Sequence, residues 1–105
     1  MNMFLGACVL ALAALAAADD LKIVDEFSYI DLFKNEEKWK AARPCLLEKA
    51  PCGELQALKD ATEQRLRSKC GQCTPEQLEK YNRDLEALRT TYPDDYEEIK
   101  KKYLN

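Results

Sequence analysis

Four cysteines constrain this chain more than any other feature of its sequence. They follow the spacing C-x6-C-x17-C-x2-C, at Cys45, Cys52, Cys70 and Cys73. An even number of cysteines in a short chain indicates disulfides if the protein enters an oxidising compartment. A fifth cysteine, Cys8, lies in an apolar N-terminal stretch that we expect to be removed.

The N-terminal stretch predicts this compartment. Residues 1–18 read MNMFLGACVLALAALAAA, carry no charged side chain and end in three alanines, which suit signal peptidase. The run is shorter than the roughly 20 residues that a membrane-spanning helix needs. We therefore predict a secretory signal peptide over residues 1–18, cleavage after Ala18, and one secreted, extracellular domain over residues 19–105.

The rest of the chain predicts an all-α fold, a compact bundle of five to six short helices. The chain has only three glycines, and no stretch alternates apolar and polar residues for long. A domain this short is expected to need disulfides beside its core. The expected helices cover residues 28–35, 36–49, 54–69, 75–92 and 93–103.

The helix ends carry more specific signals. Thr74, Pro75 and Gln77 form a capping box with proline at the first helical position. Pro44 should kink or restart its helix, because it lacks a backbone donor. Gly71 should end the preceding helix in a positive-φ conformation.

Two other interpretations of the cysteines remain to be weighed. Cys70-Gly71-Gln72-Cys73 is typical of thiol oxidoreductases, but their motif follows a β-strand, and here it follows a predicted helix. A zinc site is disfavoured because such sites usually pair two short knuckles, whereas six residues lie between Cys45 and Cys52. We therefore expect no metal and no cofactor.

The charged residues do not indicate catalysis. The chain has no histidine, so no Ser/His/Asp or Cys/His set is possible, and we predict that it is not an enzyme. Glu76–Lys80 and Glu79–Arg83 should pair at i, i+4 on outward faces. A net charge of −3 argues against nucleic acid and anionic membranes as partners. We expect a monomer without stable membrane insertion.

Several short motifs together resemble a known family. PCLLEKAPC is followed by CGQCTPEQ, with IDLFKN upstream and YPDDYEEIKKKY downstream. These motifs resemble the insect-type chemosensory proteins, also called the OS-D or pheromone-binding A10 family, over about residues 25–103. The resemblance implies about six short helices around an apolar channel, with disulfides Cys45–Cys52 and Cys70–Cys73.

The resemblance also implies a function and a set of residues. The protein would be a secreted carrier of small hydrophobic ligands, such as fatty acids, semiochemical-like lipids or odorants, in chemosensory or general lipid transport. The alternative is a secreted developmental, signalling or structural protein that acts through its surface. This sequence has Ala42 where the family often has tyrosine, and Thr62 where it has leucine. By position, the channel or core candidates are Phe27, Ile30, Leu32, Phe33, Leu46, Leu47, Leu58, Thr62, Leu66, Tyr81, Leu85, Tyr96 and Ile99.

Overall fold

The computed structural model describes residues 21–105, and every regular element among them is helical. Residues 21–26 are helical. The elements that follow are α2 (Tyr29–Lys34), α3 (Glu36–Leu46), η1 (Gly53–Leu55), α4 (Gln56–Arg67), α5 (Pro75–Thr91), α6 (Pro93–Ile99) and the π turn η2 (Lys100–Leu104). The predicted all-α fold is confirmed. The predicted signal peptide lies outside the described residues.

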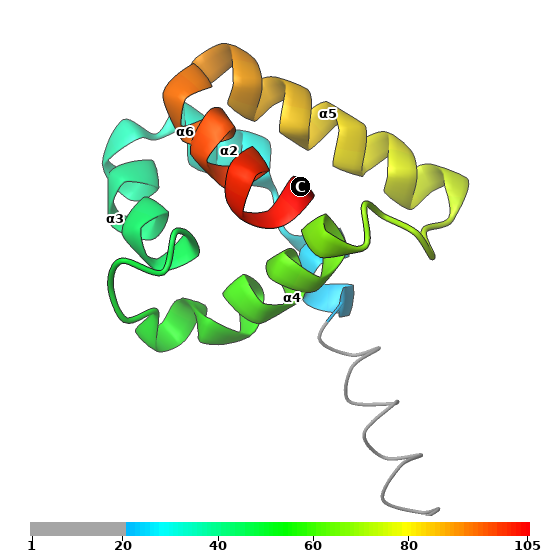
Figure 1. Cartoon of the computed structure of the whole chain (residues 1–105), viewed down its shortest axis with the longest axis horizontal. Coiled ribbons are helices and arrows are strands. Elements are labelled where there is room, and N and C mark those ends of the chain that lie inside the picture. The colour runs from blue at the N-terminus through cyan, green and yellow to red at the C-terminus, as the bar shows by residue number, and fades with distance from the viewer. Residues whose placement is uncertain (1–20) are drawn as a thin grey trace, which may run out of the picture.

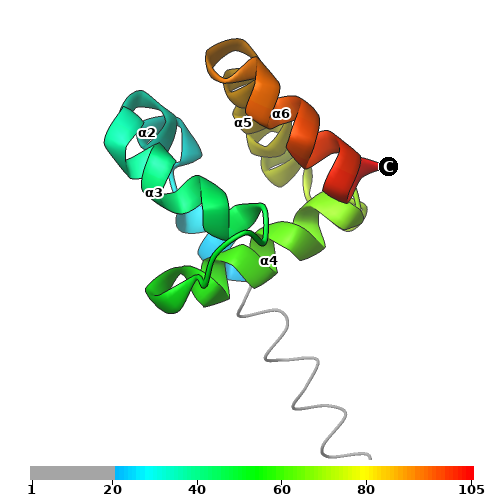
Figure 2. The same cartoon turned by 60° about the vertical axis from the view of Figure 1, so that its left-hand side comes forward.

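The helices pack around one core. Figure 2 shows α2 and α3 on one side, α5 and α6 on the other, and α4 running beneath both. Helix α2 contacts α3 and α5, α6 packs against α5, and η2 returns to α4, so the C-terminus closes the bundle (Figure 1). The buried apolar cluster consists of Val24, Tyr29, Phe33, Trp39, Leu47, Ala61, Leu66, Leu88, Ile99 and Tyr103.

The helix starts follow from side chains that accept hydrogen bonds from free backbone N–H groups. Ser28 Oγ accepts from Asp31 at the start of α2. Asn35 Oδ1 accepts from the Lys38 N–H, 3.1 Å away, at the start of α3. At α5, Thr74 Oγ1 accepts from the Gln77 N–H at 3.2 Å, and Gln77 Oε1 accepts from the Thr74 N–H at 2.8 Å. The predicted capping box is therefore confirmed.

The end of α3 differs from the prediction. The helix contains Pro44 without restarting and ends at Leu46, short of the expected Lys49. Proline removes the N–H donor at position 44, but the Pro44 carbonyl accepts from the Lys49 N–H at 2.7 Å. Glu48 follows with φ at 58°, which turns the chain out of the helix.

The expected positive φ at Gly71 is wrong. Lys69 and Cys70 adopt it instead, with φ at 53° and 59°. A Cβ added to Gly71 would lie 3.0 Å from the Ser68 carbonyl oxygen. Glycine therefore suits position 71 because the space beside it is tight, and not because of its backbone angle.

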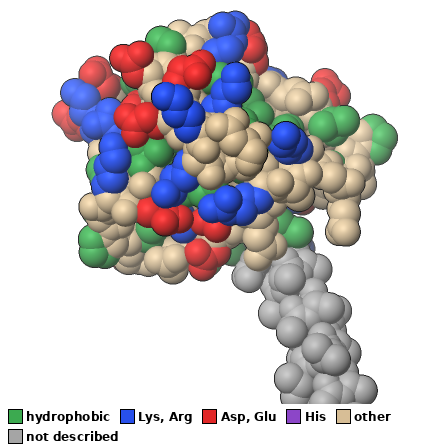
Figure 3. All heavy atoms as spheres, in the orientation of Figure 1, with side chains coloured by type: hydrophobic (Ala, Val, Ile, Leu, Met, Phe, Trp, Pro, Cys, Tyr) green, Lys and Arg blue, Asp and Glu red, His purple; other side chains and the backbone are tan. Residues whose placement is uncertain are grey.

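The surface carries both signs of charge. Figure 3 shows acidic and basic side chains interspersed over one face. The predicted pairs Glu76–Lys80 and Glu79–Arg83 are absent from the ion pairs of residues 21–105, and Lys80 instead pairs with Asp84 at 2.8 Å. Lys80 also lies over the Tyr29 ring, 4.9 Å from its centroid, so this lysine turns inward and away from Glu76.

Among residues 21–105, no helix has both the length and the apolarity to cross a membrane.

Candidate functional site

An inner pocket lies within the helical bundle. Its volume is about 70 Å³, below the roughly 300–1,000 Å³ of typical ligand sites. Much of its wall is buried core, and its charged residues come from the N-terminal segment, α4 and α5. The lining residues are Val24, Asp25, Tyr29, Phe33, Trp39, Leu46, Thr62, Arg65, Leu66, Gln77, Lys80, Tyr81, Asp84, Leu85, Leu88 and Ile99.

A larger lateral pocket lies between the start of α2, the face of α3 and the start of α4. Its volume is about 480 Å³, within the range of small-molecule sites. The small side chains of Ala41 and Ala42 leave space on α3, where a tyrosine at position 42 would project. The lining residues are Phe27, Ser28, Tyr29, Asp31, Leu32, Lys38, Ala41, Ala42, Leu46, Leu55, Leu58 and Lys59.

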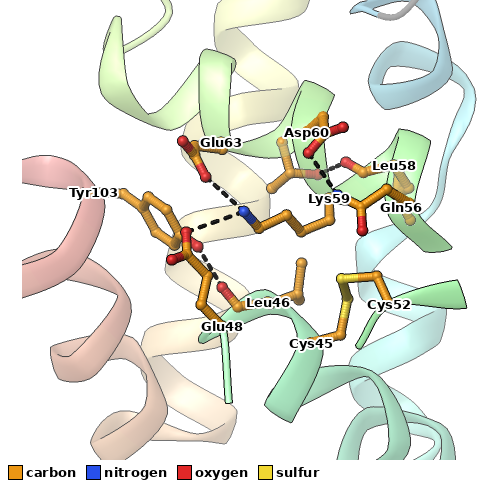
Figure 4. The surroundings of a disulfide bond; sticks show 11 residues. Cys45, Leu46, Glu48, Cys52, Gln56, Leu58, Lys59, Asp60, Glu63 and Tyr103 are labelled. Carbon is orange, nitrogen blue, oxygen red and sulfur yellow. Dashed lines mark hydrogen bonds and ion pairs between the residues drawn. A yellow bond between two sulfur atoms is a disulfide. The ribbon is translucent and has the colours of Figure 1, made fainter. Parts of the chain in front are cut away.

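Tyr29 and Leu46 line both pockets and so form the wall between them. The Phe27 ring packs edge-on against Tyr29, with ring centroids 4.8 Å apart. The Tyr103 hydroxyl donates to the Leu46 carbonyl, as Figure 4 shows beside the Cys45–Cys52 disulfide. The C-terminal turn therefore holds one side of this wall in place.

Two hydroxyl groups meet at this wall: Tyr29 belongs to it, and Thr62 lies on its inner-pocket side. The Tyr29 hydroxyl lies 2.5 Å from Thr62 Oγ1, and Thr62 Oγ1 donates to the Leu58 carbonyl at 2.6 Å. Burial raises the pKa of Tyr29 to about 12, although its hydrogen bond with Thr62 acts in the opposite direction. Tyr29 is therefore a neutral phenol near physiological pH.

The charged residues beside the inner pocket are paired with one another. Arg65, whose side chain is 9% exposed, lies 3.1 Å from Asp25, and the Gln77 amide donates to Asp25 at 2.8 Å. Lys80 donates to Asp84 at 2.8 Å and to the Val24 carbonyl at 3.2 Å. Formally, the two cations and two carboxylates cancel, so this rim of the pocket has no net charge.

A buried carboxylate fixes α3 against α6. Trp39 Nε1 donates to Asp95 Oδ2 at 2.9 Å, and Arg43 lies 3.5 Å from the same carboxylate. Trp39 stacks on Tyr92 with ring centroids 5.5 Å apart. Asp95 is thus a buried hydrogen-bond acceptor as well as a first-turn acid of α6.

Both disulfides implied by the resemblance are confirmed. Cys45–Cys52 joins the end of α3 to the turn before α4, with Cα atoms 4.9 Å apart. Cys70–Cys73 closes the turn between α4 and α5, with Cα atoms 5.2 Å apart. In residues 21–105, no cluster of three or more histidine, cysteine or acidic side chains could hold a metal ion.

Comparison with known proteins identifies the family. The model of the insect pheromone-binding family, A10/OS-D, matches residues 22–105. The chain belongs to the A10/OS-D family. No curated protein and no solved structure is significantly similar to it. Membership makes this chain part of a family of small binding proteins.

The structure distributes the predicted site residues of this A10/OS-D chain over the two pockets and the core. Ile30, Leu47 and Tyr96 line neither pocket: Leu47 is buried core, and Tyr96 packs against the core. Those at the inner pocket are Phe33, Leu46, Thr62, Leu66, Tyr81, Leu85 and Ile99. Those at the lateral pocket are Phe27, Leu32, Leu46 and Leu58. Contact of any of them with ligand stays a prediction.

Several lining residues were not among the predicted site residues. Tyr29, Trp39 and Leu88 occupy apolar positions at helical spacing, so the pattern marks them as core without showing that they border a pocket. Arg65 and Lys80 gave no such signal, because charged residues on a helix usually face solvent.

Proposed function

We propose that this A10/OS-D protein is a carrier that binds one small hydrophobic ligand in the lateral pocket. One end of the ligand would reach the wall formed by Tyr29 and Leu46. The observation that carries the proposal is an apolar pocket of about 480 Å³ whose inner wall is shared with the core cavity. Family membership supports it, because the family is described as pheromone-binding.

The energetics of apolar burial are sufficient for such a carrier. Each CH₂ group transferred from water contributes about 0.8 kcal/mol, so about ten buried groups contribute roughly 8 kcal/mol. Before the entropy cost of association is subtracted, this corresponds to a Kd of about 1 µM without any charged partner. Phe27, Leu32, Leu55 and Leu58 supply the apolar contacts. Long-chain lipids and odorant-like molecules of matching size fit this description.

The proposed carrier acts outside the cell and catalyses no reaction. Removal of residues 1–18 would leave a secreted domain with its disulfides formed. The absence of histidine from the sequence and the ion pairing of the carboxylates around the inner pocket support a binding role without acid–base chemistry.

Displacement of a fluorescent apolar probe from the oxidised protein, residues 19–105, tests the proposal. Long-chain alcohols or esters should displace the probe at micromolar concentrations. Ala41→Phe should weaken probe binding, because Ala41 lines the lateral pocket on the exposed side of α3. Ala57→Phe is the matched control, since Ala57 is an exposed alanine on α4 that lines neither pocket.

The outcomes separate the carrier from a protein that acts through its surface. If no fatty acid, ester or aromatic volatile displaces the probe at micromolar concentrations, the carrier function is wrong. If Ala41→Phe and Ala57→Phe bind the probe equally well, the lateral pocket is not the site.

A further inference from the structure

Three hydrogen-bonding groups meet at the wall between the pockets: the Tyr29 hydroxyl, the Thr62 hydroxyl on the inner-pocket side and the backbone carbonyl of Leu58, which lines the lateral pocket. Thr62 Oγ1 donates to the Leu58 carbonyl at 2.6 Å. A hydroxyl has one proton, so Thr62 cannot also donate to Tyr29. In the 2.5 Å contact between the two hydroxyls, Tyr29 is therefore the donor. Both hydroxyl protons are engaged within the protein.

Only acceptor capacity remains on this pair. A hydroxyl oxygen has two lone pairs, and Thr62 uses one of them to accept from Tyr29. Within residues 21–105, no protein group donates to the Tyr29 oxygen. The raised pKa of Tyr29, about 12, keeps the phenol protonated at neutral pH and preserves this direction of donation. A ligand that reaches the wall therefore meets hydrogen-bond acceptors.

The cations beside the hydroxyl pair are already paired. Lys80 is engaged by Asp84 at 2.8 Å and by the Val24 carbonyl at 3.2 Å. Arg65 is engaged by Asp25 at 3.1 Å. To pair with either cation, a ligand carboxylate would have to break one of these pairs and leave a carboxylate without its cation, which is costly where Asp84 is only 14% exposed.

In the lateral pocket, Lys59 is paired with Glu48 and Glu63. Lys38, which has no ion pair among residues 21–105, lies exposed at the edge of this pocket.

We propose that, among ligands of equal length, this site selects a neutral molecule that ends in a hydroxyl group and donates a hydrogen bond to the Tyr29–Thr62 pair. The inference rests on the proposed carrier function and specifies the class of ligand. An ether or ester has only acceptors, so it gains no hydrogen bond from this pair and loses those it made with water.

Three ten-carbon ligands test the proposal by displacement of the same probe near neutral pH: 1-decanol, 1-methoxydecane and decanoate. The alcohol should bind about 3- to 10-fold more tightly than the ether, the effect of one neutral hydrogen bond. It should also bind more tightly than decanoate, because a carboxylate cannot donate to the hydroxyl pair and an ion pair with the exposed Lys38 adds little.

Variants then assign the preference to the hydroxyl pair. Thr62→Val removes one oxygen and should reduce the alcohol-to-ether ratio toward unity, whereas Thr62→Ser keeps the hydroxyl and should keep the ratio. Thr90→Val is the matched control: Thr90 makes the same kind of bond, to the Glu86 carbonyl at 3.0 Å, but is exposed and lines neither pocket.

The outcomes distinguish this inference from the function on which it rests. If none of the three ligands displaces the probe, the carrier function itself fails. If all three displace it equally, or if the ether or decanoate binds most tightly, the carrier function stands and selection for a hydroxyl group is wrong. If Thr62→Val does not fold, the wild-type ratio and its retention in Thr62→Ser still decide the question.

Discussion

The two disulfide-closed corners of the bundle are stabilised in opposite ways. The first corner, residues 45–56, is held by side chains from distant parts of the chain. Lys59 lies 3.0 Å from Glu48 and 2.8 Å from Glu63, and the Tyr103 hydroxyl donates to the Leu46 carbonyl (Figure 4). The second corner, residues 68–74, is held mainly by its own backbone and by the helix cap that follows it.

This difference shows that the two corners have different structural roles. The second corner reverses the chain locally and connects α4 to α5. The first corner connects α3, α4 and the C-terminal turn, and its Leu46 is part of the wall shared by both pockets. A change at the first corner should therefore reach the candidate site, whereas a change at the second should mainly affect stability.

Removal of each disulfide should give the largest contrast. The double substitution Cys45→Ala and Cys52→Ala opens a ring of eight residues. Loop-closure entropy predicts that closing this ring stabilises the fold by about 2.5 kcal/mol. Cys70→Ala with Cys73→Ala opens a smaller ring worth about 2 kcal/mol, but relaxation of Lys69 and Cys70 from positive φ would return about 1 kcal/mol. Urea unfolding of both variants measures the losses. A greater loss at the second corner would reverse the comparison.

Loss of the central lysine should weaken the first corner alone. Lys59→Met should lower the free energy of unfolding by about 1–2 kcal/mol, because its side chain is only 12% exposed and bridges two carboxylates. Lys40→Met is the control: Lys40 pairs with Glu36 at 3.1 Å, but both side chains are more than 60% exposed, so it should cost under about 0.5 kcal/mol. Equal effects would show that the bridge adds nothing.

Backbone substitutions should act on the second corner. Lys69→Gly should raise the free energy of unfolding by about 0.5–1 kcal/mol, since lysine is strained at φ 53°. Gly71→Ala should lower it by about 1 kcal/mol, because the added Cβ would meet the Ser68 carbonyl oxygen. Thermal unfolding of both variants checks these signs, and stabilisation by Gly71→Ala would contradict the structure.

The smallest expected effect is a pH-dependent loss of stability at the first corner, caused by protonation of Glu63. The hydrogen bond from Lys59 holds the pKa of Glu63 below its ordinary value of 4.5. A depressed folded pKa adds stability that is present above the unfolded pKa and lost as pH falls through the folded one. Glu63→Gln should therefore cost about 0.5 kcal/mol near neutral pH and nothing in strong acid. Urea unfolding at both pH values tests this, and a cost independent of pH would be inconsistent with it.

Sequence patterns predicted the parts of this fold that are local. The Thr74–Gln77 box lies within one helical turn, so the sequence alone was enough to predict it. Family resemblance supplied the pairing of the cysteines. The patterns could not predict that Lys69 and Cys70, and not Gly71, would take positive φ, because lysine and cysteine have no preference for that conformation.

The candidate site was less predictable because its key contacts join distant residues. Tyr29 and Thr62 are 33 positions apart, and Tyr103 and Leu46 are 57 apart. Helical periodicity places each of them on an inward-facing side of its helix, but it does not determine which helices pack against each other. Ion pairs at i, i+4 were misassigned for the same reason: Lys80 has two acidic neighbours at that spacing, and only tertiary packing selects Asp84.

The position of Trp39 gives the protein an internal optical sensor. It is the single tryptophan of the chain, it is 1% exposed, and it lines the inner pocket but not the lateral one. Its fluorescence should therefore respond to a ligand that passes the wall into the core and stay constant for a ligand that remains outside. How deeply a bound molecule penetrates can thus be followed in the unlabelled protein.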